Sequence, residues 1–260
     1  MKYTFFLDID GTLINKNNPN PSEQLIRIVS QARSEGHRFF INTARSTANI
    51  DPKRFSLHLF DGLCSGCGTQ ITYRGECIYE HTVPPEEVFG LAERVTTRCP
   101  DINFVLEGID ALYVSVEPWK PQNIKYDSVA ELREKHPDLK IQKFATSSNQ
   151  HIPQEVTADF EDRFDIYRHP SYTEIVPKGY SKGKAAEIVE KLLDIPHEST
   201  VAVGDSDNDI PMMEYCAVSV AMGDSTEKVK EKCTMITDSV DEDGAAKAIA
   251  KICGIPYPTV

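Results

Sequence analysis

The opening of the chain alternates strand, helix and strand, and this order restricts the fold more than any other feature of the sequence. Residues 3–7 are a short apolar run that suits a strand, and residues 38–43 suit a second, largely buried strand. Between them we expect a helix over about residues 21–35, with Asn20 as N-cap, Pro21 in the first turn and apolar side chains at helical spacing. A unit of this kind joins two parallel strands of one sheet.

The same order returns near the C-terminus. Residues 184–193 have helical periodicity, and residues 200–204 are a β-branched run typical of a buried strand. Short strands are expected at residues 218–222 and 234–237, followed by a closing helix at about residues 242–252. The predicted fold class is therefore α/β, with a doubly wound, mostly parallel sheet.

The middle of the chain differs in composition. It is richer in proline and charge, and apolar residues alternate with polar ones in segments such as residues 112–116. Proline and glycine clusters at residues 84–85 and 177–179 mark its two ends. We expect an inserted α+β cap domain at residues 82–176, and a core formed by residues 1–81 and 177–260.

Charge and cysteine usage narrow the classes of partner. The 260 residues include 40 acidic and 28 basic ones, and the formal net charge of −12 repels a nucleic-acid backbone. No apolar run approaches the roughly 18 residues that cross a bilayer, and Asp8 comes too early for a signal peptide. Seven cysteines, an odd number, suit reduced thiols. We expect a cytoplasmic protein, a monomer or small homo-oligomer, that binds neither nucleic acid nor membranes.

Two carboxylates follow the first predicted strand. Asp8 and Asp10 are two residues apart, so the strand period would turn both toward one side, at the sheet edge where open α/β folds bind ligands. Close carboxylates repel unless one is protonated or a cation lies between them, so magnesium beside a nucleophile and a general acid/base is one physical solution. Gly11 and Thr12 let the backbone turn sharply and offer amide donors to an anion, although an Asp-Gly pair also marks an ordinary turn.

A second acidic cluster follows the predicted strand at residues 200–204. Asp205, Asp207, Asn208 and Asp209 offer oxygen ligands that suit a hard cation. The glycine and final glutamate of a calcium loop are absent at the matching offsets. A loop that caps the next helix would explain one aspartate but not three. We therefore expect a cation site at these strand ends.

Four segments, taken in order, resemble the haloacid dehalogenase-like (HAD) phosphohydrolases, and more closely their Cof-like branch of sugar-phosphate and related phosphatases. The sequence DIDGTL at residues 8–13 is similar to the first motif of that family. Thr43 falls at the phosphate-binding position of the second motif, Lys182 at the lysine of the third, and residues 204–209 match the acidic fourth. The resemblance covers most of both ends of the chain and is weak across the insertion.

The resemblance implies a phosphoric monoester hydrolase that uses Mg²⁺ and acts on small phosphorylated metabolites, sugar phosphates first, through an aspartyl-phosphate intermediate. Asp8 would be the nucleophile and Asp10 the general acid/base, while Thr43 and Lys182 would hold the phosphoryl oxygens. The metal would be held by Asp8, Asp10 through its carbonyl, and Asp205, with Asn208 and Asp209 in support. The substrate would be bound by Gly11, Thr43, Ala44, Arg45 and Lys182.

Two positions depart from the family pattern. Ala44 replaces the glycine of a Thr-Gly-Arg sequence, which would alter the approach of the backbone to phosphate. Cys67 stands where the branch often has asparagine before glycine. Cys64 and Cys67 form a Cys-x-x-Cys pair, but no second cysteine pair or His-x-His stands near it, so buried structural thiols are favoured over a redox or zinc role.

The insertion would act as a cap that excludes water and sets leaving-group specificity, with His169, Tyr172 and Glu174 as candidate substrate contacts. Two alternatives stay open: a phosphomutase with the same core chemistry, and a non-catalytic metabolite-binding protein on this fold. The lack of membrane spans excludes an ATP-driven pump, and the lack of a Walker-type loop disfavours a nucleotide kinase.

Overall fold

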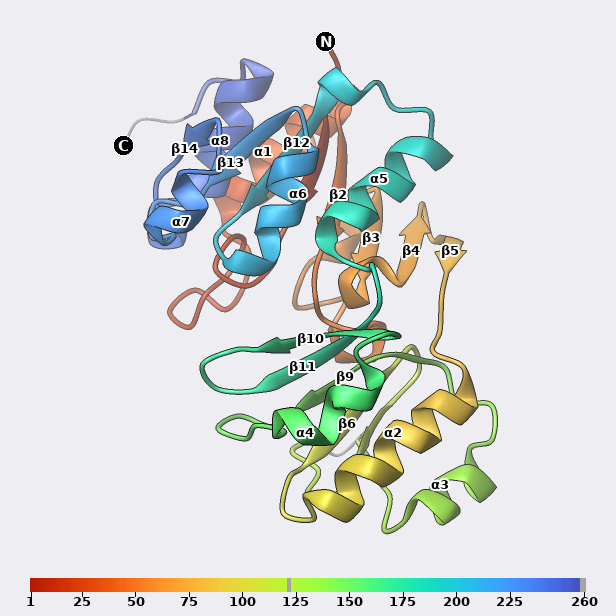
Figure 1. Cartoon of the computed structure of the whole chain (residues 1–260). Helices are drawn as coiled ribbons and strands as arrows, with labels where there is room; N and C mark the ends of the chain where they lie inside the picture. Colours follow the sequence, from red (N-terminus) through yellow and green to blue (C-terminus); the bar gives the residue numbers. More distant parts are fainter. Residues whose placement is uncertain (121–122, 258–260) are drawn as a thin grey trace. The chain divides into compact units, whose positions relative to one another are not determined.

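The computed structural model describes residues 1–120 and 123–257, and the chain divides into two compact units (Figure 1). The core unit comprises Met1–Ala44, Asp51–Tyr79 and Ser181–Val260, and the cap unit comprises Arg45–Ile50 and Glu80–Tyr180. The chain thus passes into the long part of the cap unit after residue 79 and leaves it after residue 180, beside the expected limits of 81 and 176. The short excursion at Arg45–Ile50 was not expected.

The core unit is built on an eight-stranded sheet with the strand order β14-β13-β12-β1-β2-β3-β4-β5. Neighbours from β14 to β3 are parallel, and β4 runs antiparallel to β3. The strands are β1 (Thr4–Leu7), β2 (Arg38–Asn42), β3 (Gly62–Ser65), β4 (Gln70–Tyr73), β5 (Glu76–Glu80), β12 (Thr200–Gly204), β13 (Val218–Ala221) and β14 (Met235–Ile236). The predicted mostly parallel α/β sheet is confirmed.

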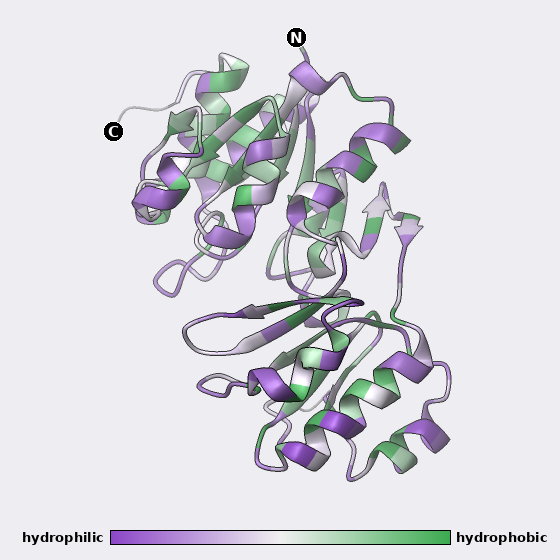
Figure 2. Ribbon diagram, viewed as in Figure 1, coloured by the Kyte–Doolittle hydropathy of each residue, from purple (hydrophilic) through white to green (hydrophobic). Residues whose placement is uncertain are grey.

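Helices cover both faces of this sheet, as a doubly wound fold requires (Figure 1). On one face α1 (Glu23–Ser34) packs beside α8 (Gly244–Cys253), and on the other α5 (Lys182–Leu192) packs beside α6 (Ile210–Tyr215), near α7 (Glu227–Lys230). Phe6 and Phe40 lie in the core beneath α5 and α6 with Met212. Figure 2 shows these central strands as hydrophobic and the outer helix surfaces as largely hydrophilic.

Helix α1 begins two residues later than the sequence indicated. Its N-cap is Ser22, whose side chain accepts a hydrogen bond from the Leu25 N–H at 3.0 Å, so the assignment of Asn20 as N-cap was wrong. Ser22 has extended backbone, and its carbonyl accepts the Ile26 N–H at 3.0 Å, so the first turn of the helix starts from this residue.

The cap unit has a six-stranded sheet with the order β10-β11-β9-β6-β7-β8, antiparallel except for the β7–β8 pair. Its strands are β6 (Phe104–Gly108), β7 (Leu112–Val114), β8 (Ile124–Lys125), β9 (Ile141–Thr146), β10 (Phe164–Arg168) and β11 (Thr173–Pro177). The helices α2 (Pro85–Arg98), α3 (Val129–Lys135) and α4 (Gln154–Thr157) pack on one face over a core that includes Phe89, Phe104 and Phe144. This unit is the α+β insertion expected from the sequence. Within residues 1–120 and 123–257, every helix is too short or too polar to span a membrane.

Candidate active site

The site begins where β1 and β12 end side by side in the core sheet. Leu7 pairs with Val203 in the parallel register, so Asp8 and Asp205 emerge at the same sheet edge. The Asp8 N–H donates to the Val203 carbonyl at 3.1 Å, which continues the ladder by one residue and fixes the backbone of Asp8. Asp8 is buried and Asp205 is half-buried. Two aspartates from distant parts of the chain are thus placed together by strand pairing.

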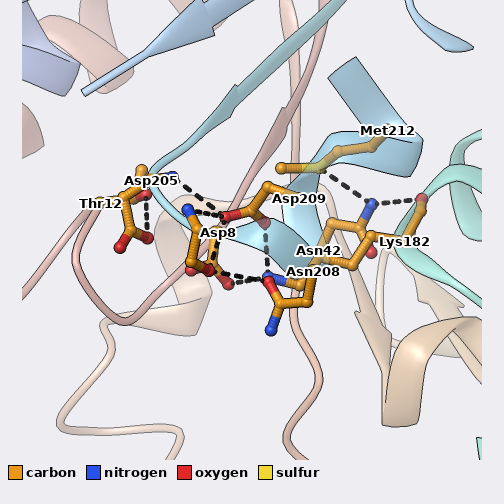
Figure 3. Close-up of polar contacts among 9 residues, drawn as sticks. Asp8, Thr12, Asn42, Lys182, Asp205, Asn208, Asp209 and Met212 are labelled. Atoms are coloured by element: carbon orange, nitrogen blue, oxygen red, sulfur yellow. Dashed lines mark hydrogen bonds and ion pairs between the residues drawn. The ribbon is translucent and has the colours of Figure 1, made fainter. Parts of the chain in front are cut away.

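Lys182 supplies the positive charge at this edge. It is the first residue of α5, which is capped by the Ser181 side chain, and its Nζ lies 2.6 Å from Oδ1 of Asp8 and 2.6 Å from Oδ1 of Asp209 (Figure 3). The side chain is 1% exposed. Burial favours the neutral amine, but the two carboxylates outweigh burial and raise the pKa of Lys182 above its usual value. The lysine is therefore charged and fixed in place.

Asp209 organises the loop that follows β12. Its Oδ2 accepts the N–H groups of Asp205 and Ser206, both at 3.0 Å, while its Oδ1 accepts from Lys182. Gly204 leaves room for this carboxylate, because a Cβ at residue 204 would lie 2.5 Å from the Asp209 Cγ. Both oxygens of Asp209 are engaged, so this residue holds the loop and the lysine in place.

The donor set suits a hard cation. Oxygen atoms of Asp8, Asp205 and Asp209 all lie within 4.8 Å of one another, and carboxylate oxygens are the ligands that Mg²⁺ prefers. Burial raises the pKa of Asp8 to about 8 even though Lys182 acts to lower it, and burial together with Asp209 raises the pKa of Asp205 to about 7. Ionisation of all three carboxyl groups beside this ammonium would leave an excess of negative charge. A divalent cation would balance that excess, so the residues present fit the expected metal.

The turn after Asp8 is built around a glycine that lies against Asp205. Gly11 has φ +84°, and a Cβ there would lie 2.3 Å from Oδ2 of Asp205. Thr12, which is buried, donates from Oγ1 to Oδ1 of Asp205 at 3.4 Å. The turn therefore constrains the second carboxylate as well as its own backbone. Thr12 was expected to contribute its backbone to this turn, and the bond from its hydroxyl to Asp205 was not expected.

Asp10 is exposed, whereas Asp8 is buried. Strand β1 ends at Leu7, so the two-residue period does not extend to Asp10, which is exposed in the following turn. Its side chain is not among the three that cluster. The alternation of side chains along a strand therefore does not determine whether Asp8 and Asp10 point to the same side.

Three other expected site residues follow from β2. Thr43 is buried directly after this strand, and its N–H donates to the Cys64 carbonyl at 2.9 Å. Ala44 is half-buried and ends the first segment of the core unit, whereas Arg45 already belongs to the cap unit. Asn42, which the sequence analysis overlooked, donates from Nδ2 to the Lys182 carbonyl at 2.8 Å and so joins β2 to the start of α5.

Asn208 and Asp207 differ in their surroundings. Asn208 Oδ1 accepts from the Ser206 hydroxyl at 3.0 Å, so it supports the loop beside Asp209. Asp207 is exposed and pairs with Lys228 at 2.6 Å. Asp207, the middle aspartate of the acidic motif, is therefore not part of the cluster.

The cysteines near Thr43 are free thiols. Cys64 is buried, and burial raises its pKa above the usual value. Cys67 has φ +58° between Gly66 and Gly68, and its N–H donates to the Thr43 carbonyl at 3.1 Å. Among the residues that the structure describes, no potential metal-binding group includes a cysteine. These observations agree with the packing role favoured from the sequence.

The three candidate cap residues meet one another. His169 Nε2 lies 2.9 Å from Oε2 of Glu174, and the His169 ring stacks on Tyr172 with centroids 4.4 Å apart. Glu174 also forms an ion pair with Lys143, and Nζ of Lys143 lies 3.6 Å from Oε1 of Glu107. This ionic group is buried within the cap sheet, and the sequence analysis identified only part of it.

The parallel sheet, the acidic strand ends and the buried lysine together form a candidate site for a cation and an anionic ligand. The chain belongs to the haloacid dehalogenase-like hydrolase family, which matches residues 5–249. The family and Cof-like branch expected from the motifs are thereby supported.

Relatives span nearly the whole chain. YkrA of Bacillus subtilis (strain 168), which is named as a phosphatase, is 26% identical over 95% of this chain and 96% of its own length. The 5-amino-6-(5-phospho-D-ribitylamino)uracil phosphatase YcsE of the same organism is 28% identical over 94% of this chain and 92% of its own. The solved structure of the HAD subclass IIB sugar phosphatase BT4131 has a TM-score of 0.78 and 25% identity, covering 98% of this chain and all of its own. These names agree with the predicted enzyme class, a HAD-type phosphatase.

Proposed function

We propose that this chain is a magnesium-dependent phosphatase that hydrolyses small phosphorylated metabolites, with sugar phosphates as the first candidates, through an aspartyl-phosphate on Asp8. The observation that carries the proposal is the cluster of three aspartates, in which Asp8 and Asp209 contact the buried Lys182 and Asp205 lies beside them. Relatives named as phosphatases, one acting on a phosphoribityl compound and one on sugar phosphates, support it.

Mg²⁺ would be held by Asp8, the Asp10 carbonyl and Asp205, with Asn208 and Asp209 in support. When bound, the cation neutralises the negative charge that otherwise keeps a phosphate ester away from a carboxylate nucleophile. Asp209 contributes mainly by fixing Lys182 and the loop, because both of its oxygens already accept hydrogen bonds.

In the first step an Asp8 carboxylate oxygen attacks phosphorus and the ester P–O bond breaks, while Asp10 gives its proton to the leaving alkoxide. In the second step Asp10 takes a proton from water, which attacks the phosphorus of the aspartyl-phosphate. Free phosphate leaves and the Asp8 carboxylate is restored. The exposed position of Asp10 suits this exchange of protons with substrate and water.

Donors around Asp8 would hold the nonbridging oxygens while charge spreads over them. Lys182 offers its ammonium and Thr43 its hydroxyl, and both are buried and fixed. The Gly11 N–H already donates to the Ile14 carbonyl at 2.8 Å, so Gly11 would serve the substrate through the shape of its turn. The Ala44 backbone would add an amide donor, and the Arg45 guanidinium would contact the phosphoryl group or the leaving group. These donors would not lose a hydration shell during the reaction, because the fold already fixes them.

The cap unit would supply leaving-group specificity through the half-buried His169 and Tyr172, with the buried Glu174 orienting His169. An imidazole held by a carboxylate suits a leaving group that offers hydroxyl donors. We further propose that the enzyme works in the cytoplasm as a monomer or small homo-oligomer, with no nucleic-acid or membrane partner.

Phosphate release from a panel of sugar phosphates and p-nitrophenyl phosphate, with Mg²⁺ and then with excess EDTA, tests the proposal. Asp8→Asn should abolish release, and Asp207→Asn, a change in the same acidic motif at an exposed ion pair, should leave it intact. Turnover that persists in EDTA or in Asp8→Asn would contradict the mechanism.

Two outcomes would favour the alternatives. Tight binding of a phosphorylated metabolite with no release, in protein that retains Asp8, would favour a metabolite-binding protein. Conversion of one sugar phosphate to its isomer without release of phosphate would favour a phosphomutase, because that enzyme returns the phosphoryl group to the sugar.

A further inference from the structure

The segment Arg45–Ile50 lies just beyond the proposed phosphate-binding Thr43 but belongs to the cap unit. The chain leaves the core unit after Ala44 and returns to it at Asp51. The chain therefore passes from one unit to the other within two residues of Thr43. Arg45, a proposed substrate contact, belongs to the cap unit.

This segment is fixed to the cap sheet by its backbone. The Thr47 N–H donates to Gln142 Oε1 at 2.7 Å, and the Ser46 N–H donates to Glu107 Oε2 at 3.4 Å. The segment itself forms a short 3-10 helix, Thr47–Asn49, in which the Asn49 N–H donates to the Ser46 carbonyl at 2.9 Å. Two cap side chains thus hold the first turn of the segment.

Further contacts fix its far end. Ala48 packs against the apolar side chains of Val105, Leu112 and Val114, on the face of the cap sheet opposite the cap helices. Lys120 Nζ donates to Asn49 Oδ1 at 3.2 Å, and Arg45 Nη1 donates to the Asn49 carbonyl at 3.4 Å. The Arg45 side chain is therefore oriented by a segment that the cap sheet carries.

A β-bulge explains how Gln142 reaches this segment. In the pairing of β6 with β9, Glu107 lies opposite Lys143 while Gly108 lies opposite Ile141, which leaves Gln142 as the extra residue. A bulge of this kind re-aims a side chain out of the regular alternation. Gln142 is fully buried and Glu107 is paired with Lys143, so both acceptors are held firmly.

We propose that Gln142 and Glu107 are positioning residues that hold Arg45–Ile50 on the cap sheet and thereby orient the Arg45 side chain for its contact with the phosphorylated substrate. The inference rests on the proposed function for its catalytic consequence. The tether itself rests on the hydrogen bonds to Ser46 and Thr47. Loosening this tether would then weaken the contact of Arg45 with the phosphorylated substrate.

Three variants separate this role from simple support of the fold. Gln142→Met keeps the length of the side chain but removes the acceptor, and Gln142→Glu keeps an acceptor. The matched control is Gln150→Met, because Gln150 Oε1 accepts the Asn103 N–H at 2.9 Å in the same unit, away from the segment.

Gln142→Met should lower kcat/KM for p-nitrophenyl phosphate about tenfold and raise the inhibition constant for inorganic phosphate by a similar factor, because a buried N–H loses its acceptor. Gln142→Glu should restore most of both, and Gln150→Met should change neither. In an Arg45→Ala background the further effect of Gln142→Met should vanish, since Gln142 acts through Arg45. A full additional loss in that background would overturn the proposal.

Amide exchange tests the tether without reference to activity. A peptide containing residues 45–50 should take up deuterium faster in Gln142→Met than in the wild type or Gln150→Met. Unchanged uptake would contradict the tether even if the enzyme were active. If the wild type released no phosphate from any ester while the exchange difference was present, the proposed function would fail and the tether would stand.

Discussion

Lys182 and Asp8 are 174 residues apart in the sequence, yet Nζ of the lysine lies 2.6 Å from Oδ1 of the aspartate. The pair joins the first turn of α5 to the end of β1, and both side chains are buried. Because the same ammonium also contacts Asp209, the three residues form one ionic unit. This unit sets the charge of the site, and it anchors the start of α5 to the end of β1.

Lys182→Met should therefore affect stability and turnover together. Two buried carboxylates would lose their common partner, a change that costs about 3–5 kcal/mol of unfolding free energy, and kcat should fall by at least about a hundredfold. Lys184→Met is the matched control, since Lys184 lies two residues further along the helix and pairs with Glu187 at the surface. Thermal unfolding and steady-state phosphate release would measure both effects. Equal losses in the two variants would argue against a special role for Lys182.

Asp10→Asn should separate binding from catalysis. Asparagine keeps the backbone carbonyl proposed for the metal but cannot exchange a proton with the leaving group or with water. Turnover should fall by about 10²–10⁴-fold, while affinity for a phosphorylated ligand, measured by calorimetry, stays close to that of the wild type. Full retention of steady-state activity would remove Asp10 from the mechanism.

Gly11→Ala should displace the Asp205 carboxylate, in addition to the free energy that a left-handed alanine costs. A Cβ at residue 11 would lie 2.3 Å from Oδ2 of Asp205, so the carboxylate must move. Gly75→Ala is the control, because Gly75 has φ +85° against +84° for Gly11 but no atom within 4 Å of an added Cβ. Both should lose about 1 kcal/mol of stability from the left-handed backbone. Only Gly11→Ala should also weaken Mg²⁺ binding, measured by calorimetry, and phosphate release.

The pH dependence of stability should report on Glu174. Burial would raise its pKa, but Lys143 and His169 outweigh burial and lower it to about 2, below its usual 4.5. The folded state therefore binds this proton less readily than the unfolded state, so the contribution to stability is complete above about pH 4.5 and is lost as pH falls toward 2. Its size is on the order of 3 kcal/mol.

Glu174→Gln should accordingly lower the free energy of unfolding most near pH 6. The difference in unfolding free energy from the wild type should shrink between pH 5 and pH 3. Urea unfolding at several pH values measures this. Glu131→Gln is the control, since Glu131 pairs with Lys135 on an exposed helix surface of the same unit and should change stability far less. A difference that stays constant with pH would contradict the assigned pKa.

The sequence predicted the core better than the cap. The strand at residues 200–204 was placed correctly, and the residues at the ends of β1 and β12 were recognised as one site because parallel strands bring their carboxyl ends to a common edge. Asn20 shows where a local pattern fails, because two residues near the start of α1 can cap a helix and Ser22, rather than Asn20, does so. Strand periodicity says nothing of Asp10, since β1 ends at Leu7.

Other features depended on contacts that no local pattern encodes. Gln142 reaches Thr47 only because a bulge forms when β6 pairs with β9, and the buried partners Lys143 and Glu107 meet across the same pair of strands. Likewise, Asn42 binds the backbone of Lys182, 140 residues away. Such partners follow from strand register, which is settled when distant segments pack together.

By itself, the sequence determined the alternation of strands and helices, the insertion between two halves of a core, and the chemical groups of the site, because hydrophobic period and motif spacing are local properties. The tertiary structure decided which aspartates share the buried site, that Asp207 faces solvent while Asp209 binds Lys182, and that Arg45 belongs to the cap unit. The physical reason is that charge pairing and burial depend on distances between atoms that lie far apart along the chain. Only the packed sheet and its helices set those distances.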